Sequence, residues 1–316
     1  MTYHDEIRKI VQIAHQYYEQ KLTQQEIAEN FGISRPTIAK LLKTAIDENI
    51  VSINIIDPFE TSIELSEKLS ACLSLRNCVV VPGKLERISI IRRNIAFAAI
   101  DYLYKVIQPG DLIGVGWGRT LYQFSERIES YPVENVMFVP LLGGIGQVKQ
   151  SLQVHNIIQN ISEAFEGTWV QYHMPGVLDR KSIRDQLLSD SKTQEMLRYW
   201  ENMTKAVVGI GESPLSNDAI FKDTIGEDEC EALIQQDAVG DICMRFYNPD
   251  GEPVDYKNLG VMSIKLSELV KVPEVIAVAG GLQKVKAIIG ASYAKYITTL
   301  ITDENTALRI IEETNQ

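Results

Sequence analysis

Apolar residues follow two different periods along this chain. Near the N-terminus they recur every three to four residues, which is the spacing of one helix face, and this predicts a helix over residues 7–18 and two more before residue 48. Beyond residue 57, short apolar runs alternate with helical patterns. Such runs predict buried parallel strands. The sequence therefore predicts a small helical unit followed by a larger α/β unit.

The expected order of the larger unit is strand then helix, repeated, which is typical of a doubly wound sheet covered on both faces. Its predicted helices are 63–73, 90–106, 120–128, 152–165, 183–188, 193–200 and 284–291, and its predicted strands are 78–81, 111–115, 136–142, 168–173, 205–210 and 275–279. Residues 237–251 predict a strand-rich hairpin, because Asn-Pro-Asp-Gly near its end is a turn signal.

The domain boundary is predicted at Asp57-Pro58, a turn or linker signal. Just before it, residues 50–56 alternate apolar and polar positions, which predicts a wing or closing strand for the small unit. A chain of 316 residues exceeds what one ordinary core supports. We therefore expect two domains, residues 1–56 and residues 57–316.

Start and stop signals for two consecutive helices lie in the segment LTQQEIAENFGISRPTIAKLL. Thr23 and Glu26 have the spacing of a capping box, in which the side chain of each residue accepts a hydrogen bond from the backbone N–H of the other. Gly32 follows, where a helix commonly ends in a left-handed residue. A second helix then begins with Ser34 as N-cap and Pro36 in its first turn. Its expected inward-facing residues are Ile38, Ala39, Leu41 and Leu42.

Two short helices joined by a glycine turn, the second with a small, basic outer face, are typical of a helix-turn-helix, either winged or plain. Helical hairpins also occur in proteins that bind no DNA, where the same side chains form a solvated face. The capping box, turn glycine, second cap and polar face together favour DNA binding. The DNA-contacting residues that we expect are Thr23, Gln24, Ser34, Arg35, Pro36, Thr37 and Lys40.

The net charge of −11 is distributed unevenly. Residues 1–56 hold six Lys/Arg and seven Asp/Glu, so that −10 of the total lies in residues 57–316. A nearly neutral DNA-reading unit contacts few phosphates alone. We therefore expect its affinity to come from two or more copies bound to a repeated double-stranded site.

Composition is that of a soluble globular protein. The N-terminus lacks the apolar run of a signal peptide, and no segment approaches the roughly 18 uninterrupted apolar residues of a membrane helix. The four cysteines lack the spacing of a metal or CxxC pair, which predicts reduced thiols. We expect a cytoplasmic protein with no membrane contact, no metal and no cofactor.

Three glycine-rich segments, GVGWGRT, LLGGIG and AGGLQK, follow apolar strands. In open α/β sheets, ligands collect beyond the carboxyl ends of the strands. Glycine lets the backbone approach a ligand, and the next helix offers free N–H groups. Arg119 adds a guanidinium that can donate two hydrogen bonds, Thr120 adds a hydroxyl and Lys284 adds an ammonium charge. These loops therefore resemble binding sites for phosphate or a phosphorylated sugar.

Other interpretations remain open at these positions. Each glycine-rich loop could serve only as a tight turn between a strand and a helix. A dinucleotide-binding site fits poorly, because Arg119 stands where the GxGxxG motif that starts at Gly114 needs glycine. The sequence also lacks a P-loop motif. Asp241 could accept hydrogen bonds from sugar hydroxyls and Arg245 could be an ion-pair partner, although the pattern alone favours structural roles. His155 and His173 could border a pocket. No histidine has a second residue spaced as a catalytic or metal partner, so we expect no catalytic site.

With these motifs in order, the chain resembles the SorC family of sugar-responsive bacterial transcriptional regulators, nearly end to end. The motifs are YYEQKLTQQEIAENFGISRPTIAKLLKTAIDENIVSINI, GDLIGVGWGRTL, VPLLGGIG, AVGDICMRFYNPDG and AVAGGLQKVKAIIGASYAKYITTLITDENTA. The resemblance implies a helix-turn-helix domain joined to an effector domain related to sugar-phosphate isomerases and deaminases. It also implies a phosphorylated sugar or similar metabolite as inducer, and oligomers, often tetramers, on palindromic operators.

The resemblance also implies the effector-binding residues. Leu142 stands where a polar residue could have met the sugar, so no lysine of this loop can form a Schiff base and the pocket is more apolar there. Phosphate binding would fall on Gly116, Gly118, Arg119, Thr120 and Lys284, ligand hydroxyls on Asp241, and further pocket lining on Gly143, Gly144 and Gly281.

We therefore expect a regulator, a repressor of a carbohydrate operon, in which a bound sugar phosphate changes the spacing of paired recognition helices. Three alternatives are an activator, a non-phosphorylated effector and a DNA-bound scaffold without any ligand. A fourth is an isomerase or deaminase fused to a DNA-binding module.

Overall fold

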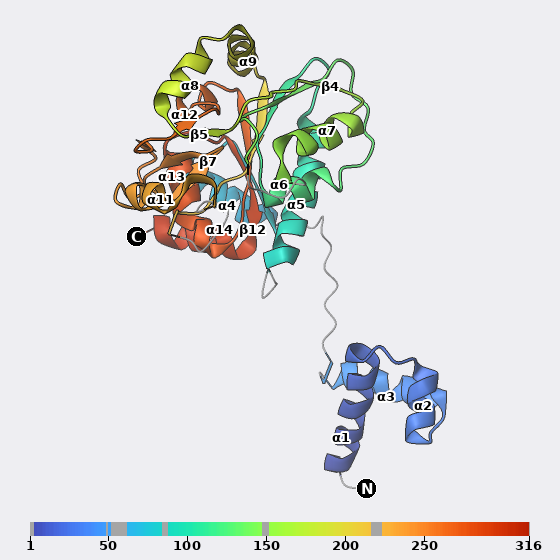
Figure 1. Cartoon of the computed structure of the whole chain (residues 1–316). Coiled ribbons are helices and arrows are strands. Elements are labelled where there is room, and N and C mark those ends of the chain that lie inside the picture. The colour runs from blue at the N-terminus through green and yellow to red at the C-terminus, as the bar shows by residue number, and fades with distance from the viewer. Residues whose placement is uncertain are drawn as a thin grey trace. The chain divides into compact units, whose positions relative to one another are not determined.

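The structure, a computed structural model, describes residues 3–48, 50–51, 62–83, 88–146, 152–215 and 223–315. The chain divides into two compact units, Met1–Asp57 and Pro58–Gln316 (Figure 1). Of the predicted wing strand, residues 52–56 lie outside the described residues.

The described residues of the small unit form three α-helices, and the caps of the second and third are those expected from the sequence. The Thr23 hydroxyl accepts from the Glu26 N–H, and the Thr23 N–H donates to Glu26 Oε2 at 2.8 Å, which completes the capping box. Gly32 ends the helix with φ +63°, and Ser34 caps the next one. The elements are α1 (Tyr3–Ala14), the π-helical turn η1 (His15–Glu19), α2 (Gln24–Phe31) and α3 (Arg35–Asp47).

The core of the small unit is built by one isoleucine from each helix. Ile13, Ile27 and Ile38 are fully buried and pack together. Ile38 and Leu42 define the inward face of α3, and Leu41 is half-buried against the same core, whereas Ala39 and Lys40 are exposed. The expectation that Ala39 faces inward is therefore wrong, since its side chain is exposed.

A parallel sheet forms the centre of the larger unit, with strand order β1-β12-β11-β6-β2-β3-β4. Its apolar strands are buried from both faces, which explains their continuous Val, Ile and Leu content. The strands are β1 (Asn77–Val81), β2 (Leu112–Val115), β3 (Met137–Pro140), β4 (Thr168–Trp169), β6 (Lys205–Val208), β11 (Glu274–Val278) and β12 (Thr299–Asp303).

Two groups of helices cover the opposite faces of this sheet (Figure 1). One group is α5 (Ile88–Val106), α6 (Arg119–Ser125) and α7 (Val154–Ala164). The other is α4 (Ile63–Leu73), α13 (Val285–Tyr293), which follows the 3₁₀ turn η3 (Leu282–Lys284), and α14 (Glu304–Thr314). The predicted doubly wound α/β fold is confirmed.

A smaller antiparallel sheet covers the region that the sequence predicted as a hairpin. The Asn-Pro-Asp-Gly turn connects β8 (Arg245–Tyr247) to β9 (Pro253–Val254), and β7 (Gly240–Ile242) pairs with β8. The β7–β8 turn consists of Cys243 and Met244, with φ of +52° and +63°. Two successive left-handed residues match the twist of a two-residue hairpin, although glycine or asparagine adopts this conformation at lower cost.

Besides these two sheets, the described residues of the larger unit form a short antiparallel β5–β10 pair and several further helices. They are β5 (Val177–Leu178), β10 (Gly260–Val261), α8 (Lys181–Leu188), α9 (Ser191–Glu201), α11 (Glu227–Ile234) and α12 (Leu266–Leu269).

A buried ion pair lies at the amino ends of the central strands. Lys205 Nζ is 2.8 and 2.9 Å from the two carboxylate oxygens of Asp111, and both side chains are about nine-tenths buried. The same carboxylate accepts from the Thr204 hydroxyl and from the Gln108 N–H. This network joins β2 to β6, the two strands whose opposite ends frame the candidate site.

Candidate functional sites

The strand order creates a crevice between β2 and β6. From β2 the chain continues to β3 on one side, whereas from β6 it continues to β11 on the other. Loops that leave neighbouring strands in opposite directions open a ligand site beyond the carboxyl ends of those strands. A cavity of about 770 Å³, open solvent at its mouth included, lies at this place. It is lined by residues 117–121, 209–212, Arg92, Leu152, Asp241, Cys243, Val278 and Lys284.

The first wall of the cavity is the start of α6. Gly118 caps this helix with φ +121°, a conformation that favours glycine because it lacks Cβ. The next two residues, Arg119 and Thr120, both line the cavity, the first half-buried and the second 8% exposed. The loop thus presents a guanidinium and a hydroxyl beside a helix N-terminus, as its sequence predicted.

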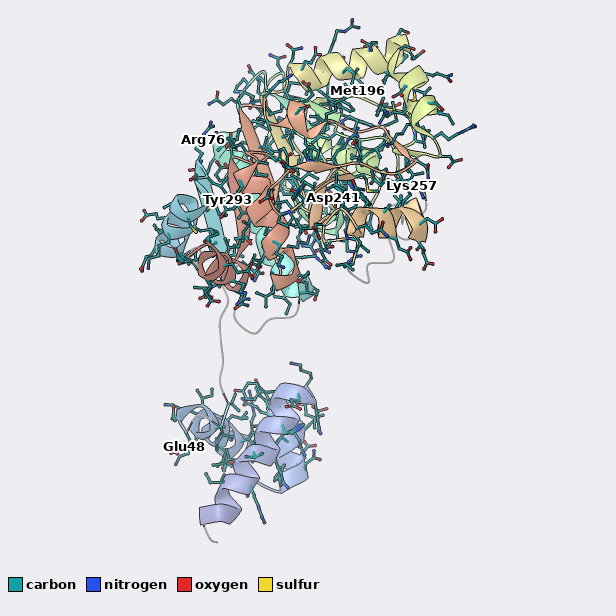
Figure 2. All side chains as sticks on the ribbon, turned by 90° about the vertical axis from the view of Figure 1, so that its left-hand side faces the viewer. Glu48, Arg76, Met196, Asp241, Lys257 and Tyr293 are labelled. Atoms are coloured by element: carbon teal, nitrogen blue, oxygen red, sulfur yellow. The ribbon has the colours of Figure 1, made fainter. Side chains whose placement is uncertain are left out.

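The second wall carries a buried carboxylate with one oxygen left over. Asp241, labelled in the interior of the larger unit in Figure 2, is 3% exposed. Its Oδ2 accepts from the Met244 N–H at 2.8 Å, whereas Oδ1 has no hydrogen-bond partner among the described residues. Burial raises the pKa of Asp241 to about 6, against the lowering effects of the Met244 hydrogen bond and the Lys284 charge. A buried acceptor without a donor is costly, so Oδ1 fits a ligand hydroxyl.

Lys284 lies among charged groups of both signs. Its ammonium donates to the Ile210 carbonyl oxygen at 2.6 Å. Burial lowers the pKa of Lys284, and the positive charges of Arg92 and Arg119 lower it further, while the carboxylates of Glu212 and Asp241 raise it. The cavity therefore gathers three cations and two carboxylates around one space.

Several predicted glycines lie outside this cavity and have packing roles. A Cβ on Gly116 would lie 3.3 Å from Cys243 Sγ, and one on Gly143 would collide with the Met174 carbonyl oxygen. The Gly281 N–H is taken by Asp303 and Thr306 oxygens. The Gly144 N–H donates to the Met174 carbonyl oxygen. For these four glycines, effector binding stays a prediction.

Two other groups that the sequence singled out are engaged within the protein. Arg245 donates to the Ser263 hydroxyl and to three backbone carbonyl oxygens of residues 261–264, which gives it a structural role. His155 approaches the Tyr172 carbonyl oxygen and stacks on His173 at 6.0 Å, and neither histidine lines the cavity.

The lining residues that the sequence did not predict include three with polar or reactive side chains that the cavity exposes, namely Arg92, Glu212 and Cys243. The sequence did contain a signal for Glu212. The run KAVVGIGE is an apolar strand followed by a glycine-rich loop, like the three segments GVGWGRT, LLGGIG and AGGLQK. Arg92 gave no such signal, since it lies within the long helix α5 and reaches the cavity only through the packing of that helix on the sheet.

The candidate DNA-reading surface is the exposed side of α3. The side chains of Arg35, Thr37 and Lys40 are exposed. Ser34 Oγ accepts from the Thr37 N–H and lies 2.7 Å from the Thr37 hydroxyl, so these two residues fix the first turn of the helix. The remaining residues expected at this surface are Thr23 and Pro36, both exposed, and Gln24, half-exposed.

In the described part of the chain, no three His, Cys, Asp or Glu side chains are grouped so that they could hold a metal ion. None of the described helices combines the length and the apolar character needed to cross a membrane.

Comparison with known proteins bears on both sites. Residues 57–312 match the family model described as "Putative sugar-binding domain", and residues 8–48 match that of sigma-70 region 4. The chain is 30% identical to the sorbitol operon regulator of Klebsiella pneumoniae and 29% identical to the deoxyribonucleoside regulator of Bacillus subtilis, with 96% of this chain and 97% of each relative covered.

Solved structures agree with these relatives. The full-length sorbitol operon regulator SorC from Klebsiella pneumoniae has a TM-score of 0.76 at 29% identity, covering 96% of this chain and 98% of that one. A transcriptional regulator from Streptococcus pneumoniae TIGR4 has a TM-score of 0.75 at 30% identity, covering 80% of this chain and 97% of that one.

A helix-turn-helix unit joined to an α/β unit with a sugar-binding fold defines a sugar-responsive transcriptional regulator. The chain belongs to this sugar-binding domain family and, among the regulators that carry the domain, to the SorC family. The expectation of a regulator rather than an enzyme is confirmed, because the relatives are operon and transcriptional regulators.

Proposed function

We propose that this regulator represses a carbohydrate operon and releases its operator when a phosphorylated sugar binds the cavity. In this proposal residues 1–56 read DNA, and residues 57–316 bind the effector and form a dimer or tetramer in the cytoplasm. One observation carries the effector assignment: Arg119, Thr120 and Lys284 converge on the same cavity as the unpartnered Oδ1 of Asp241. Cationic donors suit a phosphate, and a carboxylate oxygen suits sugar hydroxyls.

The proposed mechanism is a shift between two arrangements of the oligomer. A ligand changes DNA affinity only by as much as it binds one arrangement better than the other. Cavity walls come from both helical layers of the larger unit, through α6 and through the η3–α13 segment. A ligand that joins these walls has the contacts needed to favour one arrangement.

Thermal unfolding of the full chain with a panel of sugar phosphates, and with the same sugars unphosphorylated, tests the effector class. A ligand at 100 times its Kd stabilises the protein by about 2.7 kcal/mol. The phosphorylated members that stabilise the protein should also release an operator fragment in fluorescence anisotropy. Stabilisation by unphosphorylated sugars alone contradicts the proposal, and tighter operator binding with ligand contradicts release of the operator by the effector.

Lys284→Met is expected to weaken effector binding by roughly 10- to 150-fold, the equivalent of about 1.5–3 kcal/mol for a hydrogen bond to a charged group. Lys286→Met is the matched control, because Lys286 lies two positions further along and is exposed. Isothermal titration with a stabilising sugar phosphate measures both. Equal affinities for the two variants would remove Lys284 from the site.

Replacing Arg35 by alanine or Thr37 by valine should reduce operator discrimination by about 1–3 kcal/mol for each residue that contacts a base. Lys40→Ala should weaken binding to all sequences alike and lower the salt dependence by about one counterion if Lys40 contacts phosphate. Anisotropy titrations on operator and scrambled DNA at several salt concentrations separate these effects. Unchanged discrimination in both the Arg35 and Thr37 variants would contradict the assignment of the reading face.

A further inference from the structure

We infer that Asp303 is a positioning residue for effector binding: it fixes the loop that follows β11 and, through that loop, places Lys284 in the cavity. A chain of hydrogen bonds from the Asp303 carboxylate through Gly281 to Lys284 carries this inference. It rests on the proposed function for its effect on affinity, and it assigns the position of Lys284 rather than the identity of the ligand.

Asp303 has two roles that fall on different oxygens. It is the last residue of β12 and the N-cap of α14, and its side chain is fully buried. Its Oδ1 accepts from the Thr306 N–H at 3.1 Å, which is the capping bond. Its Oδ2 accepts from the Gly281 N–H at 3.0 Å and from the Thr306 hydroxyl at 2.6 Å. The cap therefore uses one carboxylate oxygen, and the other binds the loop after β11.

Gly281 connects this carboxylate to Lys284. Its N–H donates to Asp303 Oδ2 and also to the Thr306 hydroxyl at 2.7 Å, and its carbonyl oxygen accepts from the Lys284 N–H at 2.9 Å. With φ +109°, Gly281 has a conformation that favours glycine. A Cβ on the preceding Gly280 would collide with Asp303 Oδ2. The two glycines therefore let the loop approach the carboxylate, and the Lys284 backbone lies two hydrogen bonds from it.

The strand order places this loop between two anchors. Because β11 lies between β12 and β6, the loop that follows it lies between the ends of both neighbours. On the β12 side, Asp303 binds the Gly281 N–H; on the β6 side, the Lys284 ammonium donates to the Ile210 carbonyl oxygen at 2.6 Å. Without the first anchor, a ligand has to order the loop as it binds, and that ordering lowers its affinity.

A purely structural role for Asp303, as the cap of α14, can be separated from this one by the choice of variants. Asparagine caps a helix about as well as aspartate, but it has a single side-chain oxygen and cannot accept at both positions. Thr306→Val removes the hydroxyl that accepts from the Gly281 N–H, whereas Thr306→Ser keeps it. Asn305→Ala is the matched control, because Asn305 lies in the same turn and its amide donates to the Gly83 carbonyl oxygen, outside this loop.

Isothermal titration of the full chain with ribose 5-phosphate, fructose 6-phosphate and glucose 6-phosphate tests the inference. For the probe that binds best, Asp303→Asn and Thr306→Val are each expected to raise Kd about tenfold, because the loop is then ordered only on binding. Thr306→Ser and Asn305→Ala should change Kd less than about twofold. An unchanged Kd in both Asp303→Asn and Thr306→Val overturns the inference while the proposed function stands.

The Lys284→Met background shows whether Asp303 acts through Lys284. There, Asp303→Asn and Thr306→Val are expected to change Kd less than about twofold, because the group that they position is already absent. A structural defect that is independent of Lys284 would instead raise Kd by the same factor in both backgrounds. Such additive effects overturn the inference. Thr306→Val carries this comparison if Asp303→Asn does not fold.

Competitive acetylation of the unliganded protein over a pH series, followed for Lys284 by mass spectrometry, needs no effector. Burial lowers the pKa of the Lys284 ammonium below its usual 10.5. Release of the loop should therefore raise this pKa in Asp303→Asn and Thr306→Val, and Asn305→Ala should leave it unchanged. A Lys284 profile that is the same in all variants overturns the positioning role. If no probe binds the parent protein, the proposed effector class is wrong, and the acetylation profile alone decides the role of Asp303.

Discussion

Replacing Asp241 by asparagine is expected to stabilise the unliganded protein by up to about 3 kcal/mol at pH 7 and to abolish its response to the effector. Burial raises the pKa of Asp241 from 3.8 to about 6. Each pKa unit corresponds to about 1.4 kcal/mol, so the ionised form costs the folded state roughly this amount. Asparagine has no charge to bury and retains an oxygen that can accept from the Met244 N–H.

The pH dependence of this effect has a defined sign. Between pH 3.8 and about 6, the folded protein keeps a proton on Asp241 that the unfolded chain releases. Stability therefore falls as the pH rises through this window, because the folded state binds more protons. The gain from asparagine should be largest above pH 6 and should vanish near pH 4. Urea unfolding of both proteins at pH 4.5 and pH 7 measures it.

Effector binding should change in the opposite direction. The amide nitrogen of asparagine would replace Oδ1, the oxygen without a partner, and would present donors where a ligand hydroxyl needs an acceptor. Isothermal titration should therefore detect no binding to Asp241→Asn at ligand concentrations that saturate the parent protein. A variant that gains stability and still binds the effector would assign Asp241 a role outside the ligand site.

Lys205→Met is expected to destabilise the larger unit by about 3–5 kcal/mol, because it leaves the Asp111 carboxylate buried without its counter-charge. Among the described residues, Gln108 and Thr204 remain as donors to the Asp111 oxygens in this variant. The double variant Lys205→Met with Asp111→Asn should recover more than half of the loss. Asparagine can still accept from the Gln108 N–H and carries no charge.

The control for this prediction is an exposed ion pair. On α5, Lys105 Nζ lies 2.5 Å from Asp101 Oδ2, and both side chains are largely exposed. Lys105→Met should therefore lower the free energy of unfolding by less than about 1 kcal/mol. Urea unfolding at neutral pH compares the variants. Similar losses for Lys205→Met and Lys105→Met would contradict a structural role for the buried pair.

The helix-turn-helix could be predicted in detail because its signals are local. Thr23, Glu26, Gly32 and Ser34 determine two helix starts and one helix end through hydrogen bonds within three or four residues. The same holds for helix 63–73, whose predicted bounds agree with α4. Local signals of this kind depend little on the rest of the fold.

Two elements near the C-terminus, β12 and α14, are missing from the sequence prediction, although a buried strand there leads to an N-cap at Asp303, which accepts from the Thr306 N–H. The predicted strand 168–173 was too long, since β4 ends at Trp169. As an edge strand it pairs with β3 alone, and its length depends on that partner.

The sequence alone determined the two-unit organisation, the alternation of strands and helices, and the loop residues Arg119, Thr120 and Lys284. The tertiary structure decided which of these meet. Sheet order is a property of long-range strand pairing, and placing β6 beside β2 brings Gly209–Glu212 to the loop of Arg119. The same packing brings Arg92 to the cavity from a helix with no ligand signal. It also buries Asp241 so that one carboxylate oxygen is left without a partner.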